Sequence, residues 1–298
     1  MLPWVRIPPS PPLNVEFGDD VPDVIGSPQK VGLALGSGAA KGIAHIGVIK
    51  ALREADIPID LIAGTSMGAL VGACYAADAH ISLLEEIALT SNLRKLGQLL
   101  DLKFSFLRSG VIQGGKVENF LKKIIGDKDF AELAIPFCAV ATDIKTGNEV
   151  VINHGPLIKA VRASISIPAV FVPVNYDGRY LVDGGTTNPV PADVARFMGA
   201  TFTIAVNVLN DPKKRKHLGL TGDKKSNKPP SLINTLIQSL YIMEYEIIRA
   251  SILKADIIIE PDVSHIEAYE FYRGAEAIEA GYKAAVAVIP EIKNLLTE

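Results

Sequence analysis

Two short apolar segments, each followed by a glycine-rich turn and then by a helical pattern, constrain the fold most strongly. The first runs from Val31 to Leu35, and glycines follow it at positions 36, 38 and 42. From Ile43 to Ala55 apolar residues recur at helical spacing, and Pro58 ends this pattern before a second apolar segment begins at Leu61. A strand, a helix and a strand in this order form a βαβ unit with parallel strands. The sequence therefore predicts an α/β fold.

The rest of the chain continues to alternate between strand and helix patterns. Predicted strands cover residues 137–143, 149–152, 203–207 and 256–260, and predicted helices cover residues 156–165, 231–254 and 274–296. A turn at residues 145–148 and the pair Asp177-Gly178 predict two antiparallel hairpins. Alternation of this kind is typical of helices layered on a sheet.

Length and composition favour one large globular unit. The chain has 298 residues, of which 48% are hydrophobic, and its net charge of −3 gives no electrostatic reason to bind nucleic acid. We expect residues 30–205 to form the main α/β domain. Residues 206–298 are expected to add a basic loop, helices and a strand that pack on it. Residues 1–29 are rich in proline and are expected to form an extended or disordered arm.

Cysteine usage and the length of hydrophobic runs indicate the cellular compartment of the protein. Cys74 and Cys138 lie in apolar segments and are expected to be core residues rather than a disulfide or a metal pair. A transmembrane helix needs roughly 18 or more consecutive apolar residues, and the sequence contains no such run. We therefore expect a soluble, cytoplasmic protein or one that is peripheral at the membrane.

Ser66 is the candidate nucleophile. It stands in Gly64-Thr65-Ser66-Met67-Gly68, between the second apolar segment and a helix of small residues. Glycines around a serine permit the sharp strand-to-helix turn that exposes a nucleophilic hydroxyl. Backbone N–H groups near Gly38 and Ala39, and the N–H of Met67, are the candidate donors to an oxyanion. This pattern is typical of a serine hydrolase.

Two residues compete for the role of base. Asp183 ends a predicted strand and precedes Gly184 and Gly185, which would let a ligand or another backbone approach closely. His265 follows the last predicted strand, where the histidine of a catalytic triad could stand. A capping role for Asp183 in its own turn is the structural alternative. We expect His45, on the helix after the glycine turn, to support packing.

Several segments together resemble the patatin-like phospholipase family, and its bacterial members most of all. They are residues 33–48, 64–68, 141–143, 163–168 and 181–185, in the same order as in the family. The resemblance implies a three-layer α/β/α sandwich with a mostly parallel central sheet, and it implies hydrolysis of lipid acyl esters such as phospholipids or lysophospholipids. It also implies a dyad of Ser66 and Asp183 without histidine, metal or cofactor.

The same resemblance assigns the remaining motif positions. It implies an oxyanion hole at Gly36, Gly38, Ala39 and Met67, and a supporting motif of Lys41, Gly42, Gly64, Gly68, Gly184 and Gly185. The sequence departs from the family at Ser37, Ala39 and Ala169, where many relatives carry glycine. The alanine at position 39 tests whether that position needs a positive φ. We expect the changes at Ser37 and Ala39 to weaken the oxyanion site.

Three other functions stay open. A dinucleotide site would use the same glycine turn, although Lys41 occupies the position of its third glycine. An α/β-hydrolase would use a triad of Ser66, Asp183 and His265. A scaffold without activity would keep the fold for protein interaction. The basic run at residues 212–230 favours a solvated surface loop over contact with anionic lipid headgroups, and the sequence does not indicate an oligomeric state.

Overall fold

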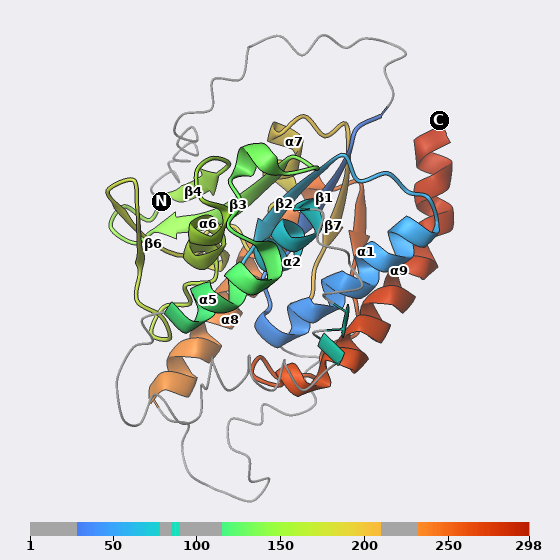
Figure 1. The fold of residues 1–298 in the computed structure, drawn as a ribbon. Coiled ribbons are helices and arrows are strands. Elements are labelled where there is room, and N and C mark those ends of the chain that lie inside the picture. Colours follow the sequence, from blue (N-terminus) through green and yellow to red (C-terminus); the bar gives the residue numbers. More distant parts are fainter. Residues whose placement is uncertain (1–28, 78–84, 87, 90–114, 210–231, 298) are drawn as a thin grey trace, which may run out of the picture.

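The central element is a mixed sheet that spans most of the chain. The computed structural model describes residues 29–77, 85–86, 88–89, 115–209 and 232–297 (Figure 1). Within these ranges the sheet has eight strands in the order β5-β6-β3-β2-β1-β7-β8, with β4 also paired to β3. The strands are β1 (Val31–Leu35), β2 (Leu61–Thr65), β3 (Phe137–Asp143), β4 (Glu149–Ile152), β5 (Val174–Tyr176), β6 (Arg179–Asp183), β7 (Phe202–Val206) and β8 (Ile257–Ile259).

Strand direction divides this sheet into two parts. The strands β3, β2, β1, β7 and β8 run parallel to one another, whereas β4 and β6 run antiparallel to β3, and β5 runs antiparallel to β6. The predicted βαβ unit is confirmed, because β1 and β2 are parallel neighbours joined through a helix. Both predicted hairpins are confirmed as β3-β4 and β5-β6.

Helices cover both faces of the sheet. They are α1 (Ala44–Glu54), α2 (Met67–Ala76), α5 (Gly115–Ile125), α6 (Leu157–Ser164), α7 (Ala192–Phe197), α8 (Leu232–Ser251) and α9 (Gly274–Thr297), and the short 3-10 helix η1 (Ala39–Ile43) precedes α1. Side chains of α1, α2, α5, α6 and α9 share one buried cluster, while α7 and α8 contribute to a second. α1 and α9 lie side by side at one edge of the molecule (Figure 1). The predicted three-layer arrangement is confirmed.

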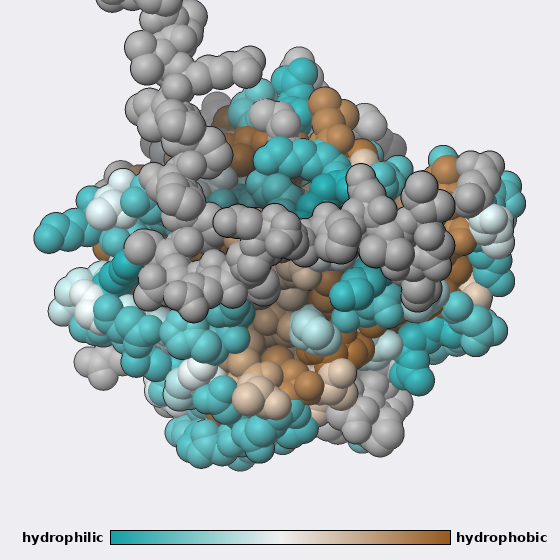
Figure 2. All heavy atoms as spheres, turned by 90° about the horizontal axis from the view of Figure 1, so that it is seen from above, coloured by the Kyte–Doolittle hydropathy of each residue, from teal (hydrophilic) through white to brown (hydrophobic). Residues whose placement is uncertain are grey.

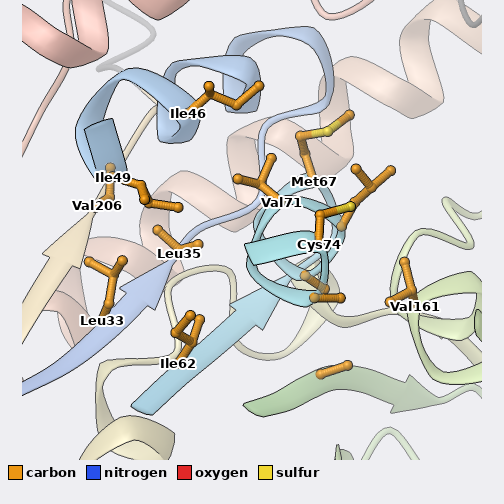
Figure 3. Packing of buried hydrophobic residues seen from close by; sticks show 14 of the residues in the cluster. Leu33, Leu35, Ile46, Ile49, Ile62, Met67, Val71, Cys74, Val161 and Val206 are labelled. Atoms are coloured by element: carbon orange, nitrogen blue, oxygen red, sulfur yellow. The ribbon is translucent and has the colours of Figure 1, made fainter. Parts of the chain in front are cut away.

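Alternation along the strands produces these two cores. Leu33 and Leu35 point into the larger cluster, whereas Ala34 between them points into the smaller one. Figure 3 shows Leu33, Leu35 and Ile62 gathered with side chains of α1 and α2, among them Ile49. Because both faces are covered, β1 and β2 are buried along their whole length, as parallel strands usually are.

Two strands, β2 and β6, pair with the same edge of β3. β2 runs parallel to β3, and β6 runs antiparallel to it. The N–H of Ile62, in β2, donates to Pro136 O, and the N–H of Ile144 donates to Tyr180 O in β6. Both bonds involve even-numbered positions of one extended segment, and backbone groups at every second position face the same edge. The N–H of Asp143 instead donates to Asn148 O, on the β4 side. The carboxyl ends of β2 and β6 therefore meet along this edge.

The surface and the helices were compared with the prediction that the chain has no transmembrane helix. Seen from above, hydrophilic residues occupy much of the rim around a hydrophobic area (Figure 2). Within the described ranges, no helix combines the length and the apolar character that crossing a membrane requires.

Cys74 and Cys138 are buried core residues, as predicted, and burial raises the pKa of both thiols. The basic run at residues 212–230 and nearly all of the N-terminal arm lie outside the described residues.

Candidate active site

Ser66 and Asp183 meet at the shared edge of β3. β2 pairs with the first half of β3 and ends with Thr65 opposite Val140. β6 pairs with the second half and ends with Asp183 opposite Ala141. Ser66 follows β2 directly, so its side chain faces the last residue of β6. Its Oγ donates a hydrogen bond to Asp183 Oδ2 at 2.6 Å, and both side chains are buried.

The turn at Ser66 is strained and tightly packed. Ser66 has φ 56° and ψ −119°, a conformation that a residue with a Cβ rarely adopts. A Cβ at Gly68 would come within 2.1 Å of Leu35 O, and one at Gly64 within 2.6 Å of the Ala69 backbone. The two glycines therefore let β1 and α2 close around the serine. The N–H of Ser66 donates to Ser164 Oγ at 2.9 Å, which fixes the turn to the end of α6.

Asp183 is buried yet receives two hydrogen bonds. Its Oδ2 accepts from Ser66 Oγ, and its Oδ1 accepts from the N–H of Gly185 at 2.8 Å. Burial raises the pKa of Asp183 to about 6, and the two hydrogen bonds act in the opposite direction. A Cβ at Gly184 would lie 2.3 Å from Val140 O, so this glycine allows the backbone of β3 to approach closely.

The glycine turn after β1 contains free backbone donors. Among the described residues, the N–H groups of Gly38 and Ala39 have no acceptor, and neither has the N–H of Met67. Ala39 adopts φ 47°, so this position does have a positive φ without being glycine. Ala39 and Met67 line a pocket together with Ser66, and Gly38 lines a second pocket beside it.

The remaining motif positions of this turn contribute to its structure. They are Gly36, Lys41 and Gly42. The N–H of Gly36 donates to Val206 O at 3.1 Å, whereas, among the described residues, the N–H groups of Gly38 and Ala39 are free; the place of Gly36 in an oxyanion hole stays a prediction. A Cβ at Gly42 would collide with the side chain of Met67, so Gly42 lets η1 and α2 pack together. Lys41 is buried within η1.

A family model matches the part of the chain that contains this site. The model described as patatin-like phospholipase matches residues 33–196, a stretch of more than half the chain that includes Ser66 and Asp183. The chain belongs to the patatin-like phospholipase family.

Individual relatives share parts of this patatin-like chain. An NTE family protein of Mycobacterium tuberculosis strain H37Rv is 39% identical over 213 residues, which are 72% of this chain and 57% of that protein. Patatin-like phospholipase domain-containing protein 6 of Homo sapiens is 37% identical over 183 residues, 60% of this chain and 13% of that protein. The chain thus spans a little over half of the mycobacterial relative and a small part of the human one.

Solved structures resemble the patatin-like chain more distantly. VipD from Legionella pneumophila has a TM-score of 0.47 and 13% sequence identity, and the likeness covers 89% of this chain and 67% of that one. The fold assignment rests instead on the sheet order, the two helical layers and the family match.

Among the described residues of this patatin-like chain, no histidine forms a hydrogen bond with Ser66 or Asp183. His265 Nε2 lies 3.4 Å from Glu276, and about half of its side chain is exposed. His154 is an exposed neighbour of Asp177. His45 is fully buried, and its Nε2–H donates to Gly36 O at 2.7 Å, so it supports the glycine turn. Burial lowers the pKa of His45 to about 4, which keeps the ring neutral. His80 and His217 lie outside the described residues.

Two pockets flank Ser66. The first has an apolar wall from α2, α5, the loop after α6 and the C-terminal region, and its lining includes Met67, Leu70, Val117, Ile165, Val170, Phe171 and Phe271. The second pocket is more polar and includes Ser37, Gly38, Asp183, Leu240, Tyr241 and Glu244. Ser66, the candidate nucleophile, therefore lies between an apolar pocket on one side and a polar pocket on the other.

Three residues of the site were not assigned a role from the sequence. Ser164 binds the N–H of Ser66, and Glu244 enters the polar pocket from α8. Arg162 is buried, donates to Ser166 Oγ and Val172 O, and lies 4.7 Å from the centre of the Phe171 ring. It thus braces the loop after α6, which contributes to both pockets. Ser164 lies within a segment that resembles the family, whereas Glu244 has no signal in the sequence.

Proposed function

We propose that this chain hydrolyses lipid carboxylic esters, with Ser66 as nucleophile and Asp183 as general base. The observation that carries the proposal is the 2.6 Å hydrogen bond from Ser66 Oγ to Asp183 Oδ2. A serine hydroxyl becomes nucleophilic when a base within hydrogen-bond reach accepts its proton. Burial raises the pKa of Asp183 to about 6, which makes it a better base than an exposed aspartate while it stays ionised at neutral pH.

Acylation is the first half of the reaction. Ser66 Oγ attacks the ester carbonyl carbon as its proton passes to Asp183 Oδ2, and the carbonyl oxygen takes up the negative charge. The free N–H groups of Gly38, Ala39 and Met67 surround Ser66 and would stabilise that charge. The intermediate then collapses, the bond to the alcohol oxygen breaks, and Asp183 returns its proton to the leaving alcohol. An ester of Ser66 with the acyl group remains.

Deacylation uses the same groups with water as the nucleophile. Asp183 accepts a proton from water, and the resulting hydroxide oxygen bonds to the acyl carbon. The same backbone donors hold the second oxyanion. When this intermediate collapses, the bond between the acyl carbon and Ser66 Oγ breaks. The proton on Asp183 returns to Ser66, and the carboxylic acid leaves.

The apolar pocket supports a lipid as the substrate. Its lining side chains next to Ser66 are uncharged and mostly aliphatic or aromatic. Moving a hydrocarbon chain from an apolar lipid phase into this pocket would therefore cost little free energy. The family match and the name of the human relative, a patatin-like phospholipase domain-containing protein, favour the same substrate class. The head group lies on the alcohol side of the ester and faces the polar pocket in this proposal.

Three variants separate the dyad from the triad and from the scaffold without activity. We expect Ser66→Ala and Asp183→Asn to lose hydrolysis of p-nitrophenyl butyrate and of phosphatidylcholine vesicles by at least about a thousandfold, and His265→Gln to keep it. Asp143→Asn is the matched control, because Asp143 is another buried carboxylate, at the end of β3. Loss of activity in His265→Gln would favour the triad, and a wild type without Ser66-dependent hydrolysis would favour the scaffold.

A further inference from the structure

Glu244 is a buried carboxyl group next to the dyad that takes no part in the mechanism above. It lies on α8, is 7% exposed, and lines the polar pocket with Ser66 and Asp183. Ser37 Oγ donates to Glu244 Oε2 at 2.9 Å. Ser37 follows Gly36 directly and precedes the free donors of the glycine turn. Glu244 is therefore connected to both the base and the oxyanion side of the site.

Gly185 leaves the space that brings the two carboxyl groups together. A Cβ at Gly185 would lie 2.5 Å from Glu244 Oε1 and 3.2 Å from Asp183 Oδ1. Both carboxyl groups thus face the same point, which would be filled by any other residue at position 185. The second glycine of the Asp-Gly-Gly sequence accommodates a side chain of α8, whereas the first accommodates the backbone of β3.

The hydrogen bonds decide which carboxyl group keeps a proton. Two buried carboxylates that face one point repel each other, so one of them is protonated at neutral pH. Asp183 accepts two hydrogen bonds, from Ser66 and Gly185, which favour its charged form. Glu244 has one, with Ser37. Among the described residues that line this pocket, the other titratable side chain is Tyr241, which lies on α8 itself.

Electrostatics agree with this assignment. Burial and then the charge of Asp183 raise the pKa of Glu244 to about 8, while the bond from Ser37 lowers it. Burial also raises the pKa of Asp183, but its two hydrogen bonds lower it, so the pair in its singly protonated state has Asp183 ionised and Glu244 neutral. This is the state that the reaction needs, because a general base must be unprotonated to accept the serine proton.

We propose that Glu244 is a positioning residue that keeps one proton in the polar pocket, so that Asp183 carries the only negative charge beside Ser66. The inference rests on the proposed function of Ser66 and Asp183. Neutral Glu244 holds the Ser37 hydroxyl and with it the start of the glycine turn. When Glu244 loses its proton, a second negative charge stands beside the place where the oxyanion forms, and it opposes that charge in a site of low dielectric.

The pH dependence of Glu244→Gln tests this role. Glutamine has nearly the same shape, can bond Ser37 and does not titrate. For the wild type we expect kcat/KM to fall at least about tenfold between pH 7 and about pH 9.5, with the loss mainly in kcat. Glu244→Gln should lower kcat/KM about threefold at pH 7 and then stay level over the same range. The matched control is Glu246→Gln, an exposed position of α8 that pairs with Arg249, and it should follow the wild type.

A second readout does not depend on activity. The infrared difference spectrum between wild type and Glu244→Gln at pH 7 should show the carbonyl band of a protonated carboxyl group, and this band should vanish above the Glu244 pKa. An alkaline loss that persists in Glu244→Gln, or an absent band at pH 7, would overturn the proposal. If the wild type shows no Ser66-dependent hydrolysis, the proposed function fails, and the infrared band still decides whether Glu244 holds the proton.

Discussion

The hydroxyl of Ser164 accepts the backbone N–H of Ser66 at 2.9 Å and itself donates to the carbonyl oxygen of Val140 at 2.6 Å. Ser164 is the last residue of α6 and is fully buried. It therefore ties the strained turn at Ser66 to β3, at the point where β2 stops pairing. The position of the serine depends on a third element as well as on the two strands that meet there.

Removing this link should weaken both the fold and the reaction. We expect Ser164→Ala to cost about 1–3 kcal/mol of unfolding free energy, because a buried N–H and a buried carbonyl lose their partner. We also expect kcat to fall about tenfold to a hundredfold at a nearly unchanged KM, since Ser66 loses its orientation. Urea unfolding and steady-state kinetics measure the two effects. Ser239→Ala, at an exposed position of α8, is the control, and an unchanged kcat in Ser164→Ala would refute the positioning role.

Asp183 should give the acid limb of the pH profile and should reduce stability. Because its pKa is raised to about 6, kcat/KM should fall as the pH drops through that value. A carboxyl group whose pKa is raised in the folded state favours folding when protonated, so its contribution is complete below the unfolded pKa and is lost as the pH rises through about 6. Asp183→Asn should therefore raise the unfolding free energy at pH 7 by about 1–3 kcal/mol while it abolishes activity. Equal stability of the two proteins at pH 7 would contradict the raised pKa.

The sequence predicted the local parts of this site better than its long-range contacts. Ser66 could be identified because glycines, an apolar strand and a small-residue helix surround it within a few positions. Glu244 could not, because one glutamate on an amphipathic helix carries no sign of pointing inward. The partner of the Gly36 N–H could not be foreseen for the same reason, since it is the carbonyl of Val206, which is distant in the sequence. Likewise, nothing within β6 indicates that it shares an edge of β3 with β2.

His45 should make the fold sensitive to acid. Its pKa is lowered to about 4 by burial, so the folded state resists the proton that the unfolded chain accepts near pH 6.5. Its stabilising contribution is therefore present above the unfolded pKa and is lost as the pH falls toward 4. Between pH 7 and 5 we expect the wild type to lose about 2 kcal/mol more unfolding free energy than His45→Gln does. Urea unfolding at both pH values measures this difference. An equal loss of unfolding free energy in the two proteins between pH 7 and 5 would show that His45 is not the buried neutral group described above.

Two alanines with a positive φ should store backbone strain. Ala39 and Ala169 have φ of 47° and 66°, in the left-handed region that favours glycine. Ala169 is exposed, so Ala169→Gly changes little else, and we expect it to raise the unfolding free energy by about 0.5 kcal/mol. Ala287→Gly is the control of opposite sign, because Ala287 is exposed in the interior of α9 and glycine there should cost about 1 kcal/mol. Destabilisation by Ala169→Gly would contradict the strain.

Narrowing the apolar pocket should select against long acyl chains. Leu70 lies on α2, one turn after Ser66, and lines the pocket together with residues of the loop after α6. Leu70→Phe adds volume to that wall, so kcat/KM for p-nitrophenyl laurate should fall about tenfold, whereas the acetyl ester should be hydrolysed at close to the wild-type rate. Leu253→Phe makes the same change at an exposed position and should alter neither ester. A thermal melt checks that Leu70→Phe remains folded. Because overpacking alone would slow both esters alike, an equal loss on both would mean that the acyl chain does not occupy this pocket.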